Sequence, residues 1–194
     1  MGTNYEKNIN YRCNRQPCRI CYSTSRKKEE LELTLFARDT GRLPVDNLDE
    51  FTIIEGDALN YDQVKQAVHG QDIVYVNLAG DLATMGENIV QAMHEMGVKR
   101  IIAICSIGIY DKPLKAVLTP YRALADIVET SGLDYTILRP DWFTYGNEVD
   151  YALTVKGEPE TGGSLSRKSI ASFIVSVFNK PETYVNENLG ISKQ

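Results

Sequence analysis

The sequence predicts a doubly wound α/β fold, in which helices cover both faces of a parallel sheet. Short apolar runs alternate along the chain with amphipathic segments, and the runs are continuous, as in strands that are buried on both faces. The expected strands are residues 31–37, 51–55, 72–77, 100–105 and 135–138. The expected helices are residues 61–68, 87–96, 120–130 and 167–178.

The ends of several helices carry the usual sequence signals. Gly97 follows the second expected helix, where a glycine commonly ends a helix. Pro120 begins the third helix and Gly132 lies just past its end. Ser166 precedes the last helix and is expected to be its N-cap. The chain after Pro181 is expected to be a peripheral extension.

Length and charge limit the function classes. The chain has 194 residues, which suits one domain, and a net charge of −5, which argues against a nucleic acid or an anionic membrane as the partner. No apolar run reaches the roughly 18 residues of a membrane span, and the polar, basic start is unlike a secretory signal. A cytoplasmic protein with a small-molecule substrate is expected, and its oligomeric state stays open.

The carboxyl ends of parallel strands meet at one edge of the sheet, where such folds bind their ligands. A fold of this kind that binds a dinucleotide, the Rossmann fold, starts with a strand, a glycine-rich turn and a helix, because clustered backbone N–H groups hold the pyrophosphate. Residues 1–30 contain one glycine, Gly2, and no apolar run, and Pro17 interrupts any helix there. The sequence therefore predicts a Rossmann-like doubly wound parallel sheet whose first β–α unit is scrambled.

The neighbouring reading frame of this segment offers an explanation. Codons compatible with residues 5–19, shifted by one base, permit Met-Lys-Lys-Ile-Leu-Ile-Thr-Gly-Ala-Thr-Gly-Ser-Leu-Ala. That translation is an apolar strand followed by a glycine-rich turn, in the place that the fold requires. Our hypothesis is a frameshift over residues 5–28, and a genuine divergent N-terminal arm is the alternative. The coding DNA decides between them.

Three cysteines, Cys13, Cys18 and Cys21, have the C-x4-C-x2-C spacing of a plant-type iron–sulfur site. The fourth ligand would have to be Cys105, which lies in an expected buried strand. We interpret the cysteines as incidental and expect no metal site.

Six segments carry a family resemblance: LTLFARD (33–39), EGDALN (55–60), VNLAG (76–80), CSIGIYD (105–111), SGLDYTILRPDWFT (131–144) and GGSLSRKSIASFI (162–174). With them, residues 31–178 resemble the atypical short-chain dehydrogenases/reductases, in their NmrA-like, NAD(P)H-binding branch. The resemblance implies that residues 31–194 form an NAD(P)-binding domain, preceded by an aberrant segment over residues 1–30. The cofactor-binding candidates at the sheet edge are Arg38, Asp57, Ala58, Leu78, Ala79, Gly80, Ser106 and Pro140.

Arg38 bears on the choice of cofactor. An acid at the end of this strand bonds the ribose 2′-hydroxyl of NAD, whereas an arginine suits the 2′-phosphate of NADP. NADP(H) is therefore favoured over NAD(H), with Arg42 as a second contact, although Asp39 is adjacent and a solvated arginine is the structural alternative. Asp57 either faces the adenine, as the resemblance implies, or caps the following turn. The short residues Ala79 and Gly80 either admit the cofactor or form a tight turn.

The resemblance places a catalytic hydroxyl at Ser106, which could instead bond local backbone. It also implies a tyrosine on the next helix with a lysine four residues on. Tyr121 has this place but is followed by Ala125, and Tyr110 is followed by Leu114, so the Tyr-x-x-x-Lys pattern is not met. A structural role for Tyr121 is therefore favoured. Beyond Pro140, the resemblance implies that residues 141–143 line the substrate side, and core packing is the alternative for the two aromatic residues among them.

Three functions remain open. The first is a small NAD(P)H-dependent oxidoreductase that acts on a quinone, flavin or carbonyl compound. The second is a non-catalytic NAD(P)-binding sensor or regulator, which the missing lysine favours. The third is a defective frameshifted product, because a chain without the glycine-rich turn is expected to bind cofactor poorly.

Overall fold

The computed structural model describes residues 7–13, 31–43, 51–160 and 162–194. The strands of its large sheet are β1 (Lys7–Cys13), β2 (Leu31–Ala37), β3 (Thr52–Glu55), β4 (Ile73–Asn77), β5 (Arg100–Ile104), β6 (Asp134–Pro140), β8 (Ala152–Val155) and β10 (Glu187–Ser192). A second sheet pairs β7 (Phe143–Thr144) with β9 (Leu165–Ser166). The helices are α2 (Tyr61–Val68), α3 (Leu82–Met96), α4 (Thr119–Thr130) and α5 (Arg167–Asn179).

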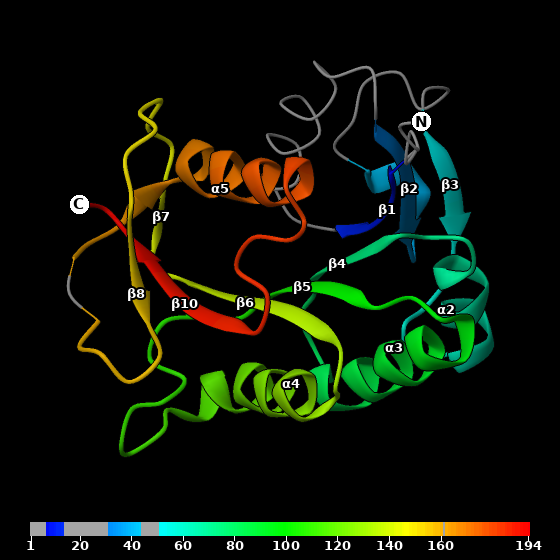
Figure 1. Ribbon diagram of the computed structural model, residues 1–194. Coiled ribbons are helices and arrows are strands. Elements are labelled where there is room, and N and C mark those ends of the chain that lie inside the picture. The colour runs from blue at the N-terminus through cyan, green and yellow to red at the C-terminus, as the bar shows by residue number, and fades with distance from the viewer. Residues whose placement is uncertain (1–6, 14–30, 44–50, 161) are drawn as a thin grey trace.

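The large sheet has the order β3-β2-β1-β4-β5-β6-β10-β8. Its neighbouring strands are parallel except for β10 and β8. Helix α5 packs on one face, and α2, α3 and α4 pack on the other (Figure 1). The expected doubly wound parallel sheet is thus confirmed, and the predicted bounds agree within two residues for every expected element except α3.

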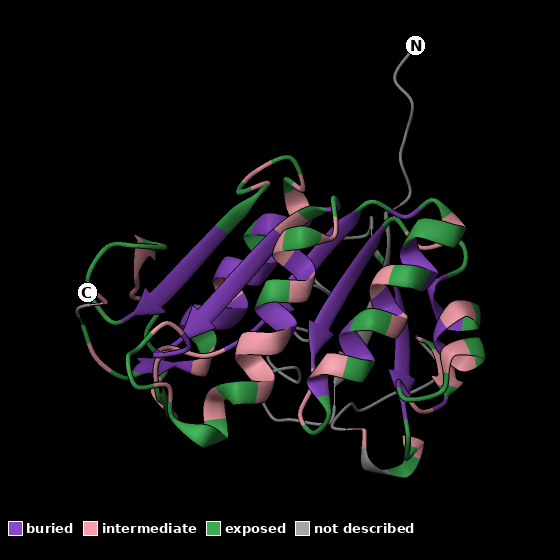
Figure 2. Cartoon of the chain, turned by 90° about the horizontal axis from the view of Figure 1, so that it is seen from below, coloured by how far each residue is buried: buried purple, intermediate pink, exposed green. Residues whose placement is uncertain are grey.

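Two apolar layers hold the helices to the sheet. On the α5 face, Tyr75 of β4 meets Phe178 of α5 edge to face, with ring centroids 5.9 Å apart. On the other face, residues of α2, α3 and α4 bury their apolar stripes against the opposite sides of the same strands. Figure 2 views this second face and shows buried strands behind helices whose outer sides are exposed.

Helix α3 starts at Leu82, five residues before the expected start at residue 87. The Asp81 carboxylate caps it by accepting from the Thr84 backbone N–H at 3.2 Å. Gly86 lies inside this helix, where glycine lowers helix propensity and hides the pattern. A Cβ at Gly86 would lie 2.9 Å from the Leu124 side chain, so close packing of α3 on α4 explains the glycine. As predicted, Gly97 ends the helix.

The first strand is present, contrary to expectation. Residues 7–13 form β1 between β2 and β4 and pair in parallel with both, so the strands that begin near residues 31 and 72 are not left with unpaired edges. The reason is that a sheet ladder uses backbone N–H and C=O groups, which a polar segment without proline also supplies. The turn and helix expected after this strand fall on residues 14–30, outside the described residues.

The segment after Pro181 is also not a peripheral extension. Residues 187–192 form β10, which pairs in parallel with β6, and its last five residues are buried. Its polar Asn188 is buried because its side chain is hydrogen-bonded: Oδ1 accepts from Arg139 Nε at 2.7 Å, and Nδ2 donates to Glu129 and to the Tyr110 hydroxyl, each at 2.7 Å. This internal polar network allows a strand without a continuous apolar run to enter the sheet.

Candidate functional site

The sheet order reverses between β1 and β4. The chain builds β1, β2 and β3 outward in one direction and then returns to place β4 on the other side of β1. Doubly wound sheets bind ligands in the crevice at this reversal, outside the carboxyl ends of the strands. The last residues of the two strands, Cys13 and Asn77, are paired in register, which locates this crevice.

A cavity of about 610 Å³ opens at the carboxyl ends of β4, β5 and β6. This volume lies in the usual range for small-molecule sites, roughly 300–1,000 Å³. Seven expected site residues line it: Leu78, Ser106, Tyr121, Pro140 and the three residues 141–143. The cavity therefore brings together residues that are up to 83 positions apart in the sequence, from Asn77 to Glu160.

Two hydroxyl groups and one ammonium group lie in this cavity. Ser106 follows β5 and Tyr121 lies in the first turn of α4. Within the described part of the chain, neither hydroxyl has a hydrogen-bond partner, so both are available to a ligand. Lys115 also lines the cavity, just before the 3-10 turn Ala116–Leu118 that leads into α4. The sequence does not mark Lys115 as a site residue, because the expected pattern places the lysine four residues after a tyrosine.

Tyr110 has a different environment from Tyr121. Its hydroxyl accepts from Asn188, and Lys156 Nζ lies 4.5 Å from its ring centroid. Burial raises the pKa of Tyr110, and the nearby Glu129 carboxylate adds to the shift. The phenol is therefore held protonated beside the cavity and not among its lining residues, which indicates a structural role.

A buried ion pair fixes the loop that carries Ser106. Arg139, at the end of β6, pairs with Glu160, and Glu160 Oε2 accepts from the Gly108 backbone N–H at 3.1 Å. Arg139 is buried, and Glu160 lines the cavity. The loop after β5 is also tied to β6 through the Ile107 N–H, which donates to the Pro140 carbonyl at 3.0 Å. These contacts hold Ser106 at a defined place in the cavity wall.

Arg38 and Asp57 lie at the ends of β2 and β3. Arg38 Nη1 is 3.8 Å from Asp57 Oδ2, and the Arg38 side chain is 55% exposed. Asp57 Oδ1 accepts from the Leu59 backbone N–H at 3.1 Å, so the turn-capping role is present. Asp39 accepts from the Gly41 N–H at 3.1 Å and thereby caps the 3-10 turn Thr40–Arg42.

The remaining candidates lie in two turns at the same edge. Ala58 is buried, and its carbonyl accepts from Asn88 Nδ2 at 2.8 Å, which ties the turn to α3. Ala79 and Gly80 follow β4. Gly80 has φ +112°, a backbone conformation that favours glycine, so the tight turn alone accounts for this residue.

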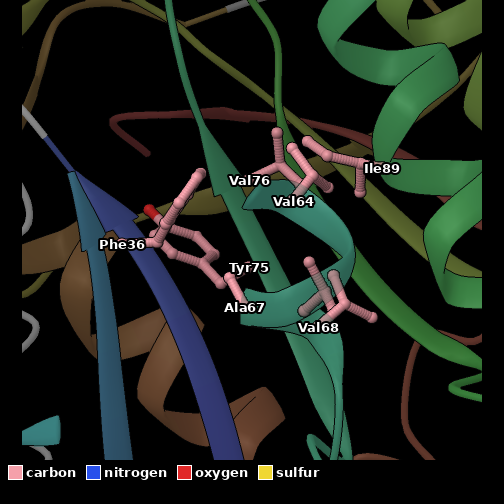
Figure 3. Close-up of a pocket in the computed structure, with 8 residues that line it drawn as sticks. Phe36, Val64, Ala67, Val68, Tyr75, Val76 and Ile89 are labelled. Carbon is pink, nitrogen blue, oxygen red and sulfur yellow. The ribbon is translucent and has the colours of Figure 1, made fainter. Parts of the chain in front are cut away.

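A second cavity is a packing gap and not a ligand site. It has a volume of about 20 Å³ and lies between α2, α3 and the sheet. Figure 3 shows Val64, Ala67 and Val68 of α2 facing Phe36 and Val76 of the sheet. A gap of this size, with mostly apolar walls, is far too small for a substrate or cofactor.

A model of the NAD(P)H-binding family matches residues 23–181. The chain belongs to this family. A Rossmann-fold NAD(P)-binding family protein from Shigella flexneri shares 40% sequence identity, with 97% of this chain and 94% of that chain covered and a TM-score of 0.88.

Two more distant structures share the fold of this family member. One is a short-chain dehydrogenase/reductase from Veillonella parvula in complex with NADP, with 22% identity, 96% and 94% of the two chains covered, and a TM-score of 0.86. The other is an anaerobillin reductase from Escherichia coli O157:H7, with 16% identity, 96% and 97% covered, and a TM-score of 0.82. None of the helices in the described ranges of the family member has the length and apolar character needed to cross a bilayer.

Proposed function

We propose that this member of the NAD(P)H-binding family is a small oxidoreductase that uses NADP(H) to reduce a quinone, flavin or carbonyl compound. One observation carries the proposal. The cavity beside the cofactor crevice presents two hydroxyls, of Ser106 and Tyr121, that have no partner among the described residues, and the Lys115 ammonium, in walls that also carry apolar side chains and the carboxylates of Asp111, Asp141 and Glu160. Such a lining suits an acceptor that takes up a hydride and a proton.

The described residues fit the cofactor at both ends of the crevice. Arg38 offers an exposed guanidinium at the end of β2, which would hold a 2′-phosphate through paired N–H groups. The turn at residues 78–80 has short side chains at its last two positions and would lie along the cofactor. Pro140 and Ser106 would border the nicotinamide end. When bound, the reduced nicotinamide supplies a hydride to the acceptor.

The acceptor then needs one proton. The Tyr121 hydroxyl can donate it, and the Ser106 hydroxyl can donate a hydrogen bond to the acceptor oxygen and orient it. Lys115 places a positive charge in the same cavity, where it stabilises negative charge that develops on that oxygen. In this scheme, Lys115 supplies from outside the helix the charge that the missing lysine at position 125 would have supplied.

A non-catalytic NAD(P) sensor is the second candidate. Its support is Ala125, which is fully buried in the core under α4, so that no lysine can occupy the usual place relative to Tyr121. In that case the cofactor would bind and no acceptor would be reduced. A product that binds no cofactor is the third candidate. The turn that would hold the pyrophosphate falls on residues 14–30, and their sequence contains no glycine.

Oxidation of NADPH with a panel of quinones, flavins and aldehydes separates these candidates. The rate of NADPH oxidation is measured for the chain as written and for a second version, the frame-restored chain, in which residues 5–28 are replaced by the translation of the shifted reading frame. We expect turnover in the restored chain, reduced about 100-fold by Tyr121→Phe, because a positioned proton donor contributes on that order. Tyr145→Phe, an exposed tyrosine outside the cavity lining, is the matched control. Tight NADPH binding without turnover would favour the sensor.

A further inference from the structure

We infer that the cavity binds an uncharged, flat ring compound of the quinone type more tightly than it binds a flavin phosphate. The ring of this compound stacks on Trp142 at the cavity mouth. This inference rests on the proposed function and narrows its substrate class. It comes from three features of the described residues: an exposed apolar rim, a fixed backbone beneath it, and the charges of the lining.

The rim is formed by Val117, Trp142 and Phe143. These side chains are 73%, 80% and 39% exposed, and all three line the cavity. Large apolar side chains that gather around one opening mark a binding site, because each is left in water that a ligand would displace. Two of the three rim residues, Trp142 and Phe143, are aromatic, which favours a flat, unsaturated ligand, since aromatic rings stack on one another.

The backbone under the rim is hydrogen-bonded on both sides. The Trp142 carbonyl accepts from the Leu165 N–H at 2.9 Å, and the Trp142 N–H donates to Asp141 Oδ1 at 2.6 Å. Phe143 begins β7, which pairs with β9. Trp142 directly precedes β7, and its carbonyl is hydrogen-bonded to the start of β9, so stacking a ring on the indole costs little backbone order.

The lining charges disfavour an anion. Asp111, Asp141 and Glu160 bring three carboxylates to the cavity, and Lys115 is the cationic side chain among its described lining residues. Arg139 neutralises Glu160 from behind, which leaves two carboxylates against one ammonium. A phosphate dianion would meet this excess of negative charge, whereas an uncharged quinone would not. The inference therefore ranks menadione above flavin mononucleotide.

The test uses the fluorescence of the full chain without cofactor. Trp142 is the single tryptophan of the chain, so its emission reports on the rim alone. We expect menadione to quench it saturably, in the micromolar range, after correction for absorbance with free N-acetyltryptophanamide. Flavin mononucleotide should need a concentration about ten-fold higher, because like charges oppose its entry. Linear quenching equal to that of the free amino acid, or tighter binding of the flavin, would overturn the inference.

Variants make the outcome specific to the rim. Phe143→Ala should raise the half-saturating menadione concentration about five-fold, because it removes an aromatic contact, while Tyr145→Ala, which is 79% exposed outside the cavity lining, should leave it unchanged. Asp111→Asn should reduce the difference between the half-saturating concentrations of menadione and the flavin, because it removes one negative charge from the cavity lining. Equal effects of Phe143→Ala and Tyr145→Ala would contradict the inference. In the frame-restored chain, turnover of NADPH with flavin but not with menadione would contradict the inference and leave the proposed function intact. Failure of that chain to bind NADPH, with menadione still quenching Trp142, would contradict the proposed function and leave the preference of the cavity intact.

Discussion

Arg38 lies at the end of β2 with an exposed guanidinium whose ion pair with Asp57 spans 3.8 Å. An exposed pair at this distance contributes little to stability. The guanidinium can therefore turn to a ligand at small cost. Asp39, the neighbouring acid, is engaged in capping Gly41, which removes one argument for NAD over NADP.

Arg38→Ala in the frame-restored chain should weaken NADPH binding about ten-fold or more, because a charged hydrogen bond contributes roughly 1.5–3 kcal/mol. NADH, which lacks the 2′-phosphate, should change little. Calorimetric titration of both cofactors measures the difference. Lys180→Ala is the control, because Lys180 lies far from the cofactor edge. It directly follows α5 and is close in sequence to Thr183, whose carbonyl accepts a hydrogen bond from Arg100 at the start of β5, on the amino edge of the sheet. Equal losses for NADPH and NADH would rule out recognition of the 2′-phosphate by Arg38.

Single residues were predictable where a strand end fixes their place. Ser106, Leu78 and Pro140 each follow or end a strand, and the parallel sheet brings them to one cavity. Lys115 was not predictable, because it reaches the cavity from an irregular segment that no periodic pattern describes. Glu160 was missed for the same reason. Its role depends on a partner, Arg139, that is 21 residues away in the sequence.

Among the secondary-structure elements, the Arg139–Glu160 pair joins β6 to the segment between β8 and β9 and to the loop at Gly108. Glu160→Gln should lower the free energy of unfolding by about 3 kcal/mol, because it removes the ion-pair partner of the buried Arg139 guanidinium. The double variant Arg139→Met/Glu160→Gln should recover about 1 kcal/mol of this loss, since it removes the uncompensated charge.

Urea unfolding of the two variants and of Glu158→Gln measures these differences. Glu158 is an exposed neighbour, so its substitution should change stability by less than about 0.5 kcal/mol. A Glu160→Gln protein as stable as this control would show that the pair does not hold the loop.

Helices α2 and α3 are linked by an ion pair that gives stability a pH dependence. Lys65 Nζ lies 2.6 Å from Glu95 Oε2, and this contact, the nearby Tyr61 hydroxyl and a hydrogen bond from Gln91 lower the pKa of Glu95 from 4.5 to about 2. The unfolded chain then binds the proton more readily than the folded chain. The contribution of this pair is therefore present above pH 4.5 and is lost as the pH falls toward 2.

The native chain should accordingly lose more stability than Glu95→Gln on going from about pH 6 to about pH 3. Urea unfolding at the two pH values gives the comparison, and the variant corrects for the other carboxylates. Parallel losses in both proteins would mean that Glu95 does not couple α2 to α3.

Helices and strands were predictable where apolar residues recur at a regular spacing. They were not predictable where polar residues become buried through hydrogen bonds to distant parts of the chain. Helix α2 has the predicted bounds, Tyr61–Val68, because its apolar stripe and its Asn60 cap lie in the local sequence. Strand β10 was not predicted because the polar Asn188 interrupts its apolar pattern. Asn188 is buried through hydrogen bonds to Arg139, Glu129 and Tyr110, which are distant in the sequence.

At the scale of the whole molecule, the alternating pattern was enough to predict the doubly wound sheet, and the cavity of about 610 Å³ lies at the edge where the sequence predicts ligand binding. The exception is the start of the chain. Residues 7–13 complete the sheet as β1, although their sequence has no apolar run, and the match to the NAD(P)H-binding family begins only at residue 23. The sheet needs only backbone groups from β1, whereas the pyrophosphate needs a glycine-rich turn after it. Folding and cofactor binding therefore make separate demands on this segment.

Titration of NADPH into the chain as written and into the frame-restored chain tests this account most directly. Both should fold, because β1 is paired on both sides in the chain as written. The restored chain should bind NADPH with micromolar affinity, and the chain as written should bind at least about 100-fold more weakly, since the sequence of residues 14–30 contains no glycine. Comparable affinity of the two chains would contradict the account, because residues 14–30 would then hold the pyrophosphate without a glycine-rich turn.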